Sequence, residues 1–372
     1  MFLLSLHRRS IQCIQRRYLS TTTVSSSSHE PLRILFCGSD RFSCASLQAL
    51  HTEHVKNGKL IEALDVMVLP PKWAGRGNKE LREVPCKLLA EKLGLRIHQR
   101  STFREWEPPE GINLIVAVSF GLFVPSRILR GVKYGGLNVH PSLLPDLRGP
   151  APLHHALLNG DKYTGVSLQT LDDKAFDHGA VLAQTSEKGF PIPEDISLPD
   201  LTAQLAEVGA TMLVQGLRDR LYIPPHKDVS SHSGKGELRH APKLTKTEAK
   251  IDWEAAHQLD SSVLERKLKG VVQVFGSVWT DAVDDFNRKK RVIFKDVRPL
   301  RKPEGGEHRK KKVFRLAEGG ERDVEVEDGT KRCLIHWGGD VWMDVGKVTV
   351  QGSPEKQAAD ALKGFLVERT TK

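Results

Sequence analysis

Asn138 and His140 lie two positions apart in the segment LNVHPSLLP, residues 137–145. Because side chains two apart on a β-strand point to the same face, this spacing predicts a carboxamide beside an imidazole. Pro141 cannot donate to a strand ladder, so we expect the strand to end there. Asp177 lies two residues before Gly179 in a predicted loop between two strands, and its carboxylate can approach the imidazole. The three groups together can donate hydrogen bonds and move a proton.

The elements that must position these residues alternate between strands and helices. The predicted strands cover residues 32–38, 63–69, 114–118, 136–139, 166–170 and 180–185. The predicted helices cover residues 42–54, 84–93, 125–129, 151–158 and 198–220. This alternation predicts an α/β fold with a doubly wound, mostly parallel, Rossmann-like sheet. In such sheets, sites form at the carboxyl ends of the strands, where Asn138 and His140 fall.

The composition of the chain changes after residue 222. Pro224, Pro225 and the run SSHSGKGE predict a linker over 223–252 that follows a catalytic domain at 31–222. Short segments rich in valine, tryptophan and glycine follow, so we expect a small β-barrel of the OB type over 253–372, closed by a last helix over 354–367.

Composition sets outer limits on the class of protein. The chain has 372 residues, of which 39% are hydrophobic and 27% charged, as in ordinary globular proteins. No apolar run approaches the roughly 18 residues of a membrane-spanning helix, so we expect a soluble protein without a membrane partner. The five cysteines are odd in number and form no CxxC pair, so the sequence indicates neither a disulfide framework nor a zinc site. They are Cys13, Cys37, Cys44, Cys86 and Cys333.

Residues 1–30 differ from the rest of the chain. No acidic residue precedes Glu30, whereas four arginines and a serine-rich tract do. Such a segment is typical of a mitochondrial or chloroplast transit peptide, and the alternative is a disordered tail. We expect a mitochondrial transit peptide and a location in the matrix.

The sequence resembles the folate-dependent formyltransferases. After LNVHPSLLP, the elements RG, AP, TGV and FDHG occur in the order of that family, and LRILFCGS, VAVSFGLFVP and KLTKTEAKIDW extend the likeness over most of the chain. The resemblance implies transfer of a formyl group from the cosubstrate 10-formyltetrahydrofolate. It is greatest to the members that act on the amino group of initiator methionyl-tRNA, so we expect a role in organellar translation initiation.

The resemblance also implies roles for single residues. Asn138 would donate a hydrogen bond to the tetrahedral oxyanion, His140 would shuttle the proton lost by the amine, and Asp177 would orient the imidazole. This chemistry requires no metal and no covalent nucleophile. The folate is expected at two loops, with contacts from Phe120, Gly121, Leu122, Ser142, Leu143, Leu144 and Pro145.

Basic residues are expected to bind the tRNA. The loop at residues 70–80 resembles a family loop that enters the acceptor stem, with Arg76 in its AGRG motif. Residues 286–315 contain 13 Lys or Arg against three acids, which fits phosphate contacts. The predicted tRNA-binding residues are Arg76, Lys243, Lys246, Arg288, Lys289, Lys290, Arg291, Lys310, Lys311 and Lys312. We expect the protein to act as a monomer on its tRNA.

Two alternatives stay open. Pro141 makes the motif HPS, as in the glycinamide ribonucleotide formyltransferases, and Asp146 and Leu147 depart from the residues common before RG in the tRNA-directed enzymes. The chain could therefore be another folate-dependent formyltransferase. It could also be a relative that binds RNA and has lost catalysis, although the three catalytic positions are intact.

Overall fold

The computed structural model describes residues 30–74, 77, 79–186, 188–230, 237–301, 309–327 and 329–368. Arg76 and the predicted transit peptide, apart from Glu30, lie outside the described residues. The chain forms two compact units that interleave along the sequence. The first unit comprises Met1–Asp146, Gly165–Phe190 and Ala203–Glu237. The second comprises Leu147–Thr164, Pro191–Thr202 and Leu238–Lys372.

A seven-stranded sheet forms the centre of the first unit, in the order β10-β9-β7-β6-β1-β2-β5. The five strands from β7 to β5 are parallel, whereas β9 is antiparallel to both of its neighbours. Only β5 was not predicted, since RIHQ contains a single large apolar residue. The strands are β1 (Leu32–Gly38), β2 (Ile61–Val68), β5 (Arg96–Gln99), β6 (Leu114–Val118), β7 (Gly136–His140), β9 (Ser167–Thr170) and β10 (Val181–Gln184).

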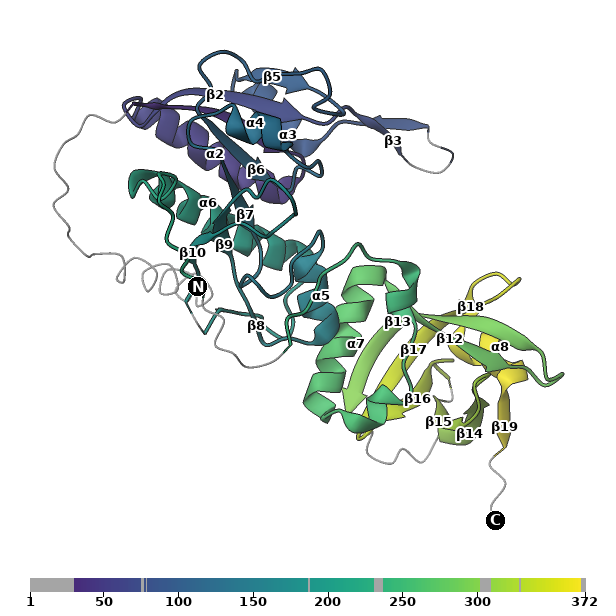
Figure 1. Ribbon diagram of the computed structural model, residues 1–372. Coiled ribbons are helices and arrows are strands. Elements are labelled where there is room, and N and C mark those ends of the chain that lie inside the picture. Colours follow the sequence, from purple (N-terminus) through teal and green to yellow (C-terminus); the bar gives the residue numbers. More distant parts are fainter. Residues whose placement is uncertain are drawn as a thin grey trace, which may run out of the picture. The chain divides into compact units, whose positions relative to one another are not determined.

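Helices cover both faces of this sheet (Figure 1). Leu35 and Cys37 of β1 pack in a buried cluster with Ile128 of α4, on one face. On the other, Gly209 of α6 approaches β7 so closely that a Cβ would lie 2.6 Å from Val139 Cγ1. The helices are α2 (Arg41–Lys56), α3 (Pro85–Lys92), α4 (Ser126–Arg130) and α6 (Leu198–Arg218). The predicted α/β class with a mostly parallel sheet is confirmed.

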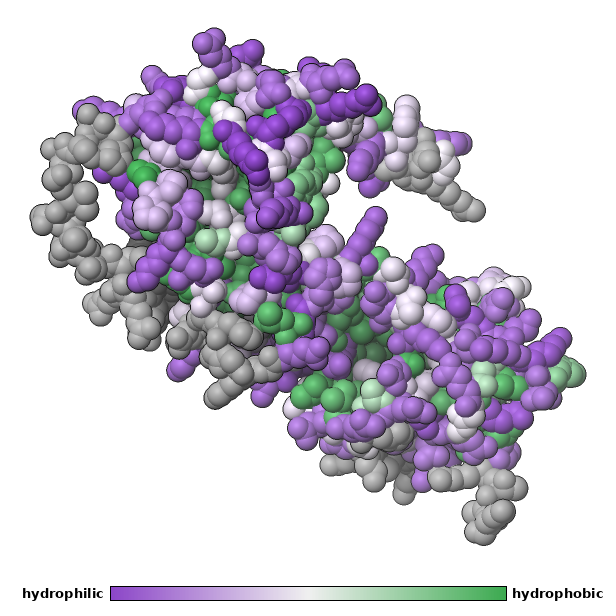
Figure 2. All heavy atoms as spheres, in the orientation of Figure 1, coloured by the Kyte–Doolittle hydropathy of each residue, from purple (hydrophilic) through white to green (hydrophobic). Residues whose placement is uncertain are grey.

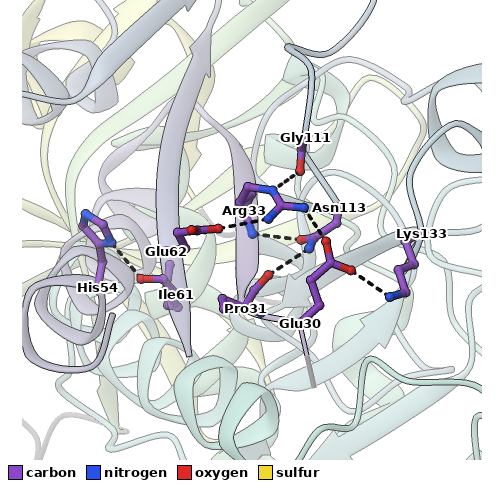
Figure 3. A network of polar contacts seen from close by, with 9 residues as sticks. All are labelled: Glu30, Pro31, Arg33, His54, Ile61, Glu62, Gly111, Asn113 and Lys133. Carbon is purple, nitrogen blue, oxygen red and sulfur yellow. Dashed lines mark hydrogen bonds and ion pairs between the residues drawn. The ribbon is translucent and has the colours of Figure 1, made fainter. Parts of the chain in front are cut away.

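A polar network ties together the amino-terminal ends of β1, β2 and β6 (Figure 3). Arg33 forms an ion pair with Glu62 at 2.9 Å and a second one with Glu30. Asn113 accepts a hydrogen bond from the Arg33 amide at 2.8 Å and donates one to the Pro31 carbonyl at 2.9 Å. These contacts hold the amino-terminal ends of the strands together, at the end of the sheet opposite to His140.

Two helices pack closely in the second unit, α5 (Pro152–Asn159) and α7 (Ser261–Phe275). Gly270 makes this possible, because a Cβ at that position would lie 2.1 Å from the Leu157 carbonyl oxygen. Residues 147–164 and 191–202 therefore group with the C-terminal part of the chain, although the sequence predicted one domain over 31–222.

An antiparallel sheet with the path β12-β13-β17-β16-β15-β14-β19 completes the second unit, with β18 added to β17. An isolated antiparallel bridge joins Ala282 of β12 to Leu316, just after β14. The predicted C-terminal β domain is thus an antiparallel sheet. Its strands are β12 (Ser277–Val283), β13 (Lys289–Arg301), β14 (Arg309–Arg315), β15 (Glu321–Glu327), β16 (Cys333–Gly338), β17 (Val341–Val350), β18 (Lys356–Gln357) and β19 (Leu366–Glu368).

The predicted last helix is wrong in extent. The helix α8 covers only Ala358–Leu362, and the chain then turns into β19, which pairs with β14. On the face shown in Figure 2, hydrophilic side chains cover most of each unit. No helix in the described part of the chain is long and apolar enough to span a membrane.

Candidate active site

Asn138 and His140 lie at the carboxyl end of β7, as the motif predicted. The register of the sheet places Asn138 beside Ala117 of β6 and directly opposite Gln169 of β9. Directly opposed residues on antiparallel strands share a face, so the Gln169 amide lies near the Asn138 amide. Gln169 was not predicted as a site residue, although it alternates with Ser167 in the segment VSLQT.

One carboxylate oxygen, Oδ1 of Asp177, gathers the polar groups of the site. It accepts a hydrogen bond from Asn138 Nδ2 at 3.2 Å and one from Gln169 Nε2 at 3.0 Å. His140 Nδ1 lies 3.4 Å from the same oxygen. The His140 and Asp177 side chains are only 6% and 7% exposed, so their interaction is weakly screened by water. The structure thus brings all three predicted catalytic residues together.

The loop that carries Asp177 depends on local backbone geometry. Asp177 has a φ of 58°, the left-handed conformation that aspartate tolerates better than most residues. Two residues later, Gly179 passes so close to β9 that a Cβ would lie 1.7 Å from the Thr170 carbonyl oxygen. Thr170 Oγ1 also accepts a hydrogen bond from the Ala180 amide at 2.9 Å. The FDHG motif therefore requires its glycine to place the carboxylate beside β7.

The Ser167 hydroxyl and the Gln184 amide hold the SLLP turn that follows His140. Ser167 Oγ donates to the Ser142 carbonyl at 2.7 Å and accepts from the Leu144 amide at 3.0 Å. Gln184 Nε2 donates to the Leu144 carbonyl at 2.8 Å, and the Leu144–Pro145 peptide is cis. The Ser142 and Leu144 side chains are buried, so a ligand at this turn would meet mainly backbone groups.

The second predicted folate loop, residues 120–125, follows β6 beside the catalytic strand. The Phe120 side chain is buried, and its carbonyl accepts a hydrogen bond from Ser39 Oγ at 3.0 Å. Gly121 has a φ of 83°, which allows the chain to turn there. A hollow of about 190 Å³ adjoins the loop. It is lined by Thr102, Phe103, Arg104, Leu122, Phe123, Pro125 and Arg127.

The predicted folate residues therefore differ in their surroundings. Leu122 lines the hollow, whereas Leu143 and Pro145 are partly exposed on the SLLP turn. Phe123 of the predicted loop and Phe176 of the FDHG motif form an edge-to-face pair with centroids 5.1 Å apart. This pair links the loop after β6 to the loop that carries Asp177.

The predicted tRNA-binding residues of the second unit lie on its surface, with acids close to several of them. Arg288 is paired with Asp284 at 2.8 Å, Lys289 with Asp281 at 3.4 Å and Lys312 with Glu368 at 3.0 Å. Lys311 lies opposite Glu325 on β15. These acids fall outside the basic segment 286–315, so the surface is less positive than the count of that segment suggested. Lys243, Lys246 and Lys310 are exposed, and Lys290 is half-buried.

Arg291 differs from its basic neighbours because it stacks on an aromatic ring. Its guanidinium carbon lies 4.0 Å from the ring centroid of Trp279, and Lys250 Nζ lies 5.8 Å from the same centroid. The Trp279 ring is thereby fixed among cations, an arrangement that suits contact with phosphates and bases.

The fold and the site together define an α/β protein with a carboxamide, an imidazole and a carboxylate clustered at the carboxyl ends of the parallel strands. The family model of the formyl transferases matches residues 32–217. The mitochondrial methionyl-tRNA formyltransferase of Saccharomyces cerevisiae is 31% identical over 92% of this chain and 91% of its own. The methionyl-tRNA formyltransferase of Cereibacter sphaeroides is 30% identical over 91% of this chain and 98% of its own. This chain belongs to the formyl transferase family, and these relatives place it among the methionyl-tRNA formyltransferases.

A solved structure supports the fold. A sugar 3N-formyltransferase, solved in the presence of dTDP and 5-N-formyl-THF, superposes with a TM-score of 0.51 over 88% of this chain and 100% of its own, at 15% identity.

Proposed function

We propose that this protein transfers the formyl group of 10-formyltetrahydrofolate to the amino group of initiator methionyl-tRNA. The observation that carries the proposal is the cluster of Asn138, His140 and Asp177 in a chain that is similar to methionyl-tRNA formyltransferases over nine-tenths of its length. The likeness to the yeast relative extends over the C-terminal unit as well, since it covers 92% of this chain.

We assign a task to each of the three proposed catalytic side chains. Attack of the amine on the formyl carbon produces a tetrahedral oxyanion. One N–H of the Asn138 amide is directed to Asp177, and the other is available to the oxyanion. His140 turns Nδ1 to Asp177, so Nε2 can accept the proton that the amine loses and pass it to the departing folate nitrogen. Asp177 holds the imidazole in that orientation and stabilises its protonated form.

The hollow beside residues 120–125 and the SLLP turn provide a site for the folate. Phe103, Leu122 and Phe123 supply apolar walls, and the backbone of both loops supplies hydrogen-bonding groups. Both loops start at the carboxyl ends of adjacent strands, β6 and β7, so a donor bound there lies beside Asn138 and His140.

The basic surface of the second unit is proposed to bind the tRNA backbone, together with Arg76 of the loop at residues 70–80. Phosphate contacts from Lys243, Lys246 and the strands β13 and β14 would add affinity without reading sequence. We propose a monomer in the mitochondrial matrix. The name of the yeast relative and the arginine-rich, acid-free start of the chain support the mitochondrial location.

An assay with two acceptors tests this function. The purified protein is supplied with 10-formyltetrahydrofolate and either methionyl-tRNA or glycinamide ribonucleotide. We expect formyl transfer to methionyl-tRNA alone. Transfer to glycinamide ribonucleotide without transfer to methionyl-tRNA would contradict the proposal and identify a glycinamide ribonucleotide formyltransferase. Binding of tRNA without transfer to either acceptor would identify an inactive relative.

A further inference from the structure

Two cysteines that the catalytic chemistry does not use lie side by side in the first unit. Cys44 is in the first turn of α2 and Cys86 is the second residue of α3, yet their sulfurs are 3.7 Å apart. Both thiols are free. A disulfide requires an S–S distance of about 2.05 Å, so small movements of the two side chains are sufficient to form the bond.

The surroundings hold the buried member of the pair in place. Cys86 is fully buried, and its Sγ lies 3.0 Å from Ser43 Oγ. The Cys86 amide also donates to the Ser39 carbonyl at 3.3 Å. Gly38 leaves the room that the thiol occupies, because a Cβ there would lie 3.0 Å from Cys86 Sγ. The two sulfurs therefore face each other as a consequence of packing.

The two thiols differ in exposure and in acidity. Cys44 is partly exposed, so a small oxidant can reach it, whereas Cys86 is not accessible. The hydrogen bond with Cys86 lowers the pKa of Cys44, and nearby Arg41 acts in the same direction, whereas desolvation and Asp40 oppose it. The same hydrogen bond and burial raise the pKa of Cys86. The reactive thiolate is therefore favoured on the accessible sulfur.

We propose that Cys44 and Cys86 form a peroxide-reactive dithiol that closes reversibly to a disulfide. The Cys44 thiolate attacks one oxygen of hydrogen peroxide, the O–O bond breaks, and hydroxide leaves as Cys44 becomes a sulfenic acid. The Cys86 sulfur then attacks the Cys44 sulfur, and the sulfenic oxygen leaves as water after taking up the Cys86 proton. In total, two thiols lose two electrons to one peroxide molecule, which is reduced to two molecules of water.

A metal site is the main alternative for two adjacent thiols. Among the residues that the structure describes, no three histidine, cysteine, aspartate or glutamate side chains are grouped so as to hold a metal ion.

A disulfide between Cys44 and Cys86 would also affect the neighbouring structure. The hairpin of β3 (Lys72–Ala74) and β4 (Glu80–Arg82) runs into α3 shortly before Cys86, so a disulfide would fasten the base of that hairpin to α2.

Mapping of cysteine oxidation in the full-length protein tests the proposal. The reduced protein is treated with hydrogen peroxide while folded, quenched by alkylation and digested. We expect mass spectrometry to find a peptide pair joined through Cys44 and Cys86, which dithiothreitol separates. The variant Cys333→Ser is the matched control, because Cys333 is equally buried but lies in the second unit, and it should form the same cross-link.

Two further variants separate the roles of the thiols. In Cys86→Ser, Cys44 should stop at the sulfenic acid and be captured by dimedone. In Cys44→Ser, Cys86 should remain reduced at the same peroxide dose. Circular dichroism verifies that each variant is folded. The proposal is overturned if folded wild-type protein yields no Cys44–Cys86 cross-link, if either residue pairs instead with another cysteine, or if Cys86 is oxidised equally well without Cys44.

Discussion

Replacement of Asn138 by alanine should separate catalysis from folding. The Asn138 side chain makes one hydrogen bond to Asp177, at 3.2 Å, while its backbone pairs with β6 and β9. Alanine keeps the strand and removes the second amide N–H that we assign to the oxyanion. Loss of one such donor costs about 3 kcal/mol of transition-state stabilisation in comparable enzymes, so kcat should fall roughly 100- to 1000-fold.

The measurement is single-turnover formylation of methionyl-tRNA at saturating donor. Asn138→Ala should lower the rate of the chemical step, while the Kd for the folate changes little, because the folate contacts are assigned to the loops after β6 and β7. Donor affinity is measured separately by fluorescence or calorimetry. The two numbers distinguish a catalytic donor from a residue that only binds substrate.

Asn113→Ala provides a matched control at the opposite end of the sheet, where the parallel strands begin. Asn113 is buried and makes two hydrogen bonds, to the Arg33 amide and the Pro31 carbonyl. Its removal should lower the free energy of unfolding by about 1–3 kcal/mol while the rate per folded molecule stays unchanged. If Asn138→Ala formylates within about threefold of the wild-type rate, its oxyanion role is refuted.

Three further predictions concern positioning, tRNA binding and stability. Gln169→Leu should lower kcat roughly tenfold and leave the Kd for the folate unchanged, because Asp177 loses a hydrogen bond of the order of 1–1.5 kcal/mol. An equal loss of folate affinity would instead indicate a general disturbance of the site. Alanine at residues 289–291 should weaken tRNA binding and reduce its logarithmic salt slope by about one for each phosphate that is no longer neutralised, which a filter-binding titration measures; an unchanged slope would contradict the assignment. Hydrogen bonds from Arg218 lower the pKa of Glu53 in the folded state, so its stabilising contribution is complete above the unfolded value of about 4.3 and is lost as the pH falls through the folded pKa. Urea unfolding should therefore show the wild type more stable than Glu53→Gln near neutral pH, with a difference that shrinks below about pH 4.3.

The positions of Asn138 and His140 could be predicted because strand periodicity is strict. Residues 138 and 140 share a face of any strand, and Pro141 marks its end, so the place of the pair followed from local rules. The contact between Asp177 and His140 could not be derived from spacing alone, because 37 positions separate the two residues. It depends on the left-handed turn at Asp177 and the close passage of Gly179, which the family resemblance indicated only as a motif. Gln169 was missed because its role arises from the register between β7 and β9, which local sequence patterns do not specify.

The second unit shows a different limit. The strand β15 was not predicted, since ERDVEVE reads as a polar segment in which only Val324 and Val326 alternate with charges. Because β15 was not predicted, the acids that lie opposite the basic residues of β14 were not predicted either. The C-terminal helix was predicted too long because residues 366–368 form the strand β19 instead. This strand pairs with β14, some 50 positions earlier in the chain, and such long-range pairing can override local helix propensity.

The interleaving of the two units has a consequence for protein engineering. The chain crosses from one unit to the other at residues 146, 164, 190, 202 and 237, so no single cut yields both units whole. Expression of residues 31–222 alone would keep α5 and remove α7, the helix on which it packs through Gly270. Such a fragment would carry every proposed catalytic side chain and still expose the apolar face of α5 to water. Exchange of residues 238–372 between relatives would therefore succeed only if α5 and residues 191–202 were transplanted with them, as one discontinuous module.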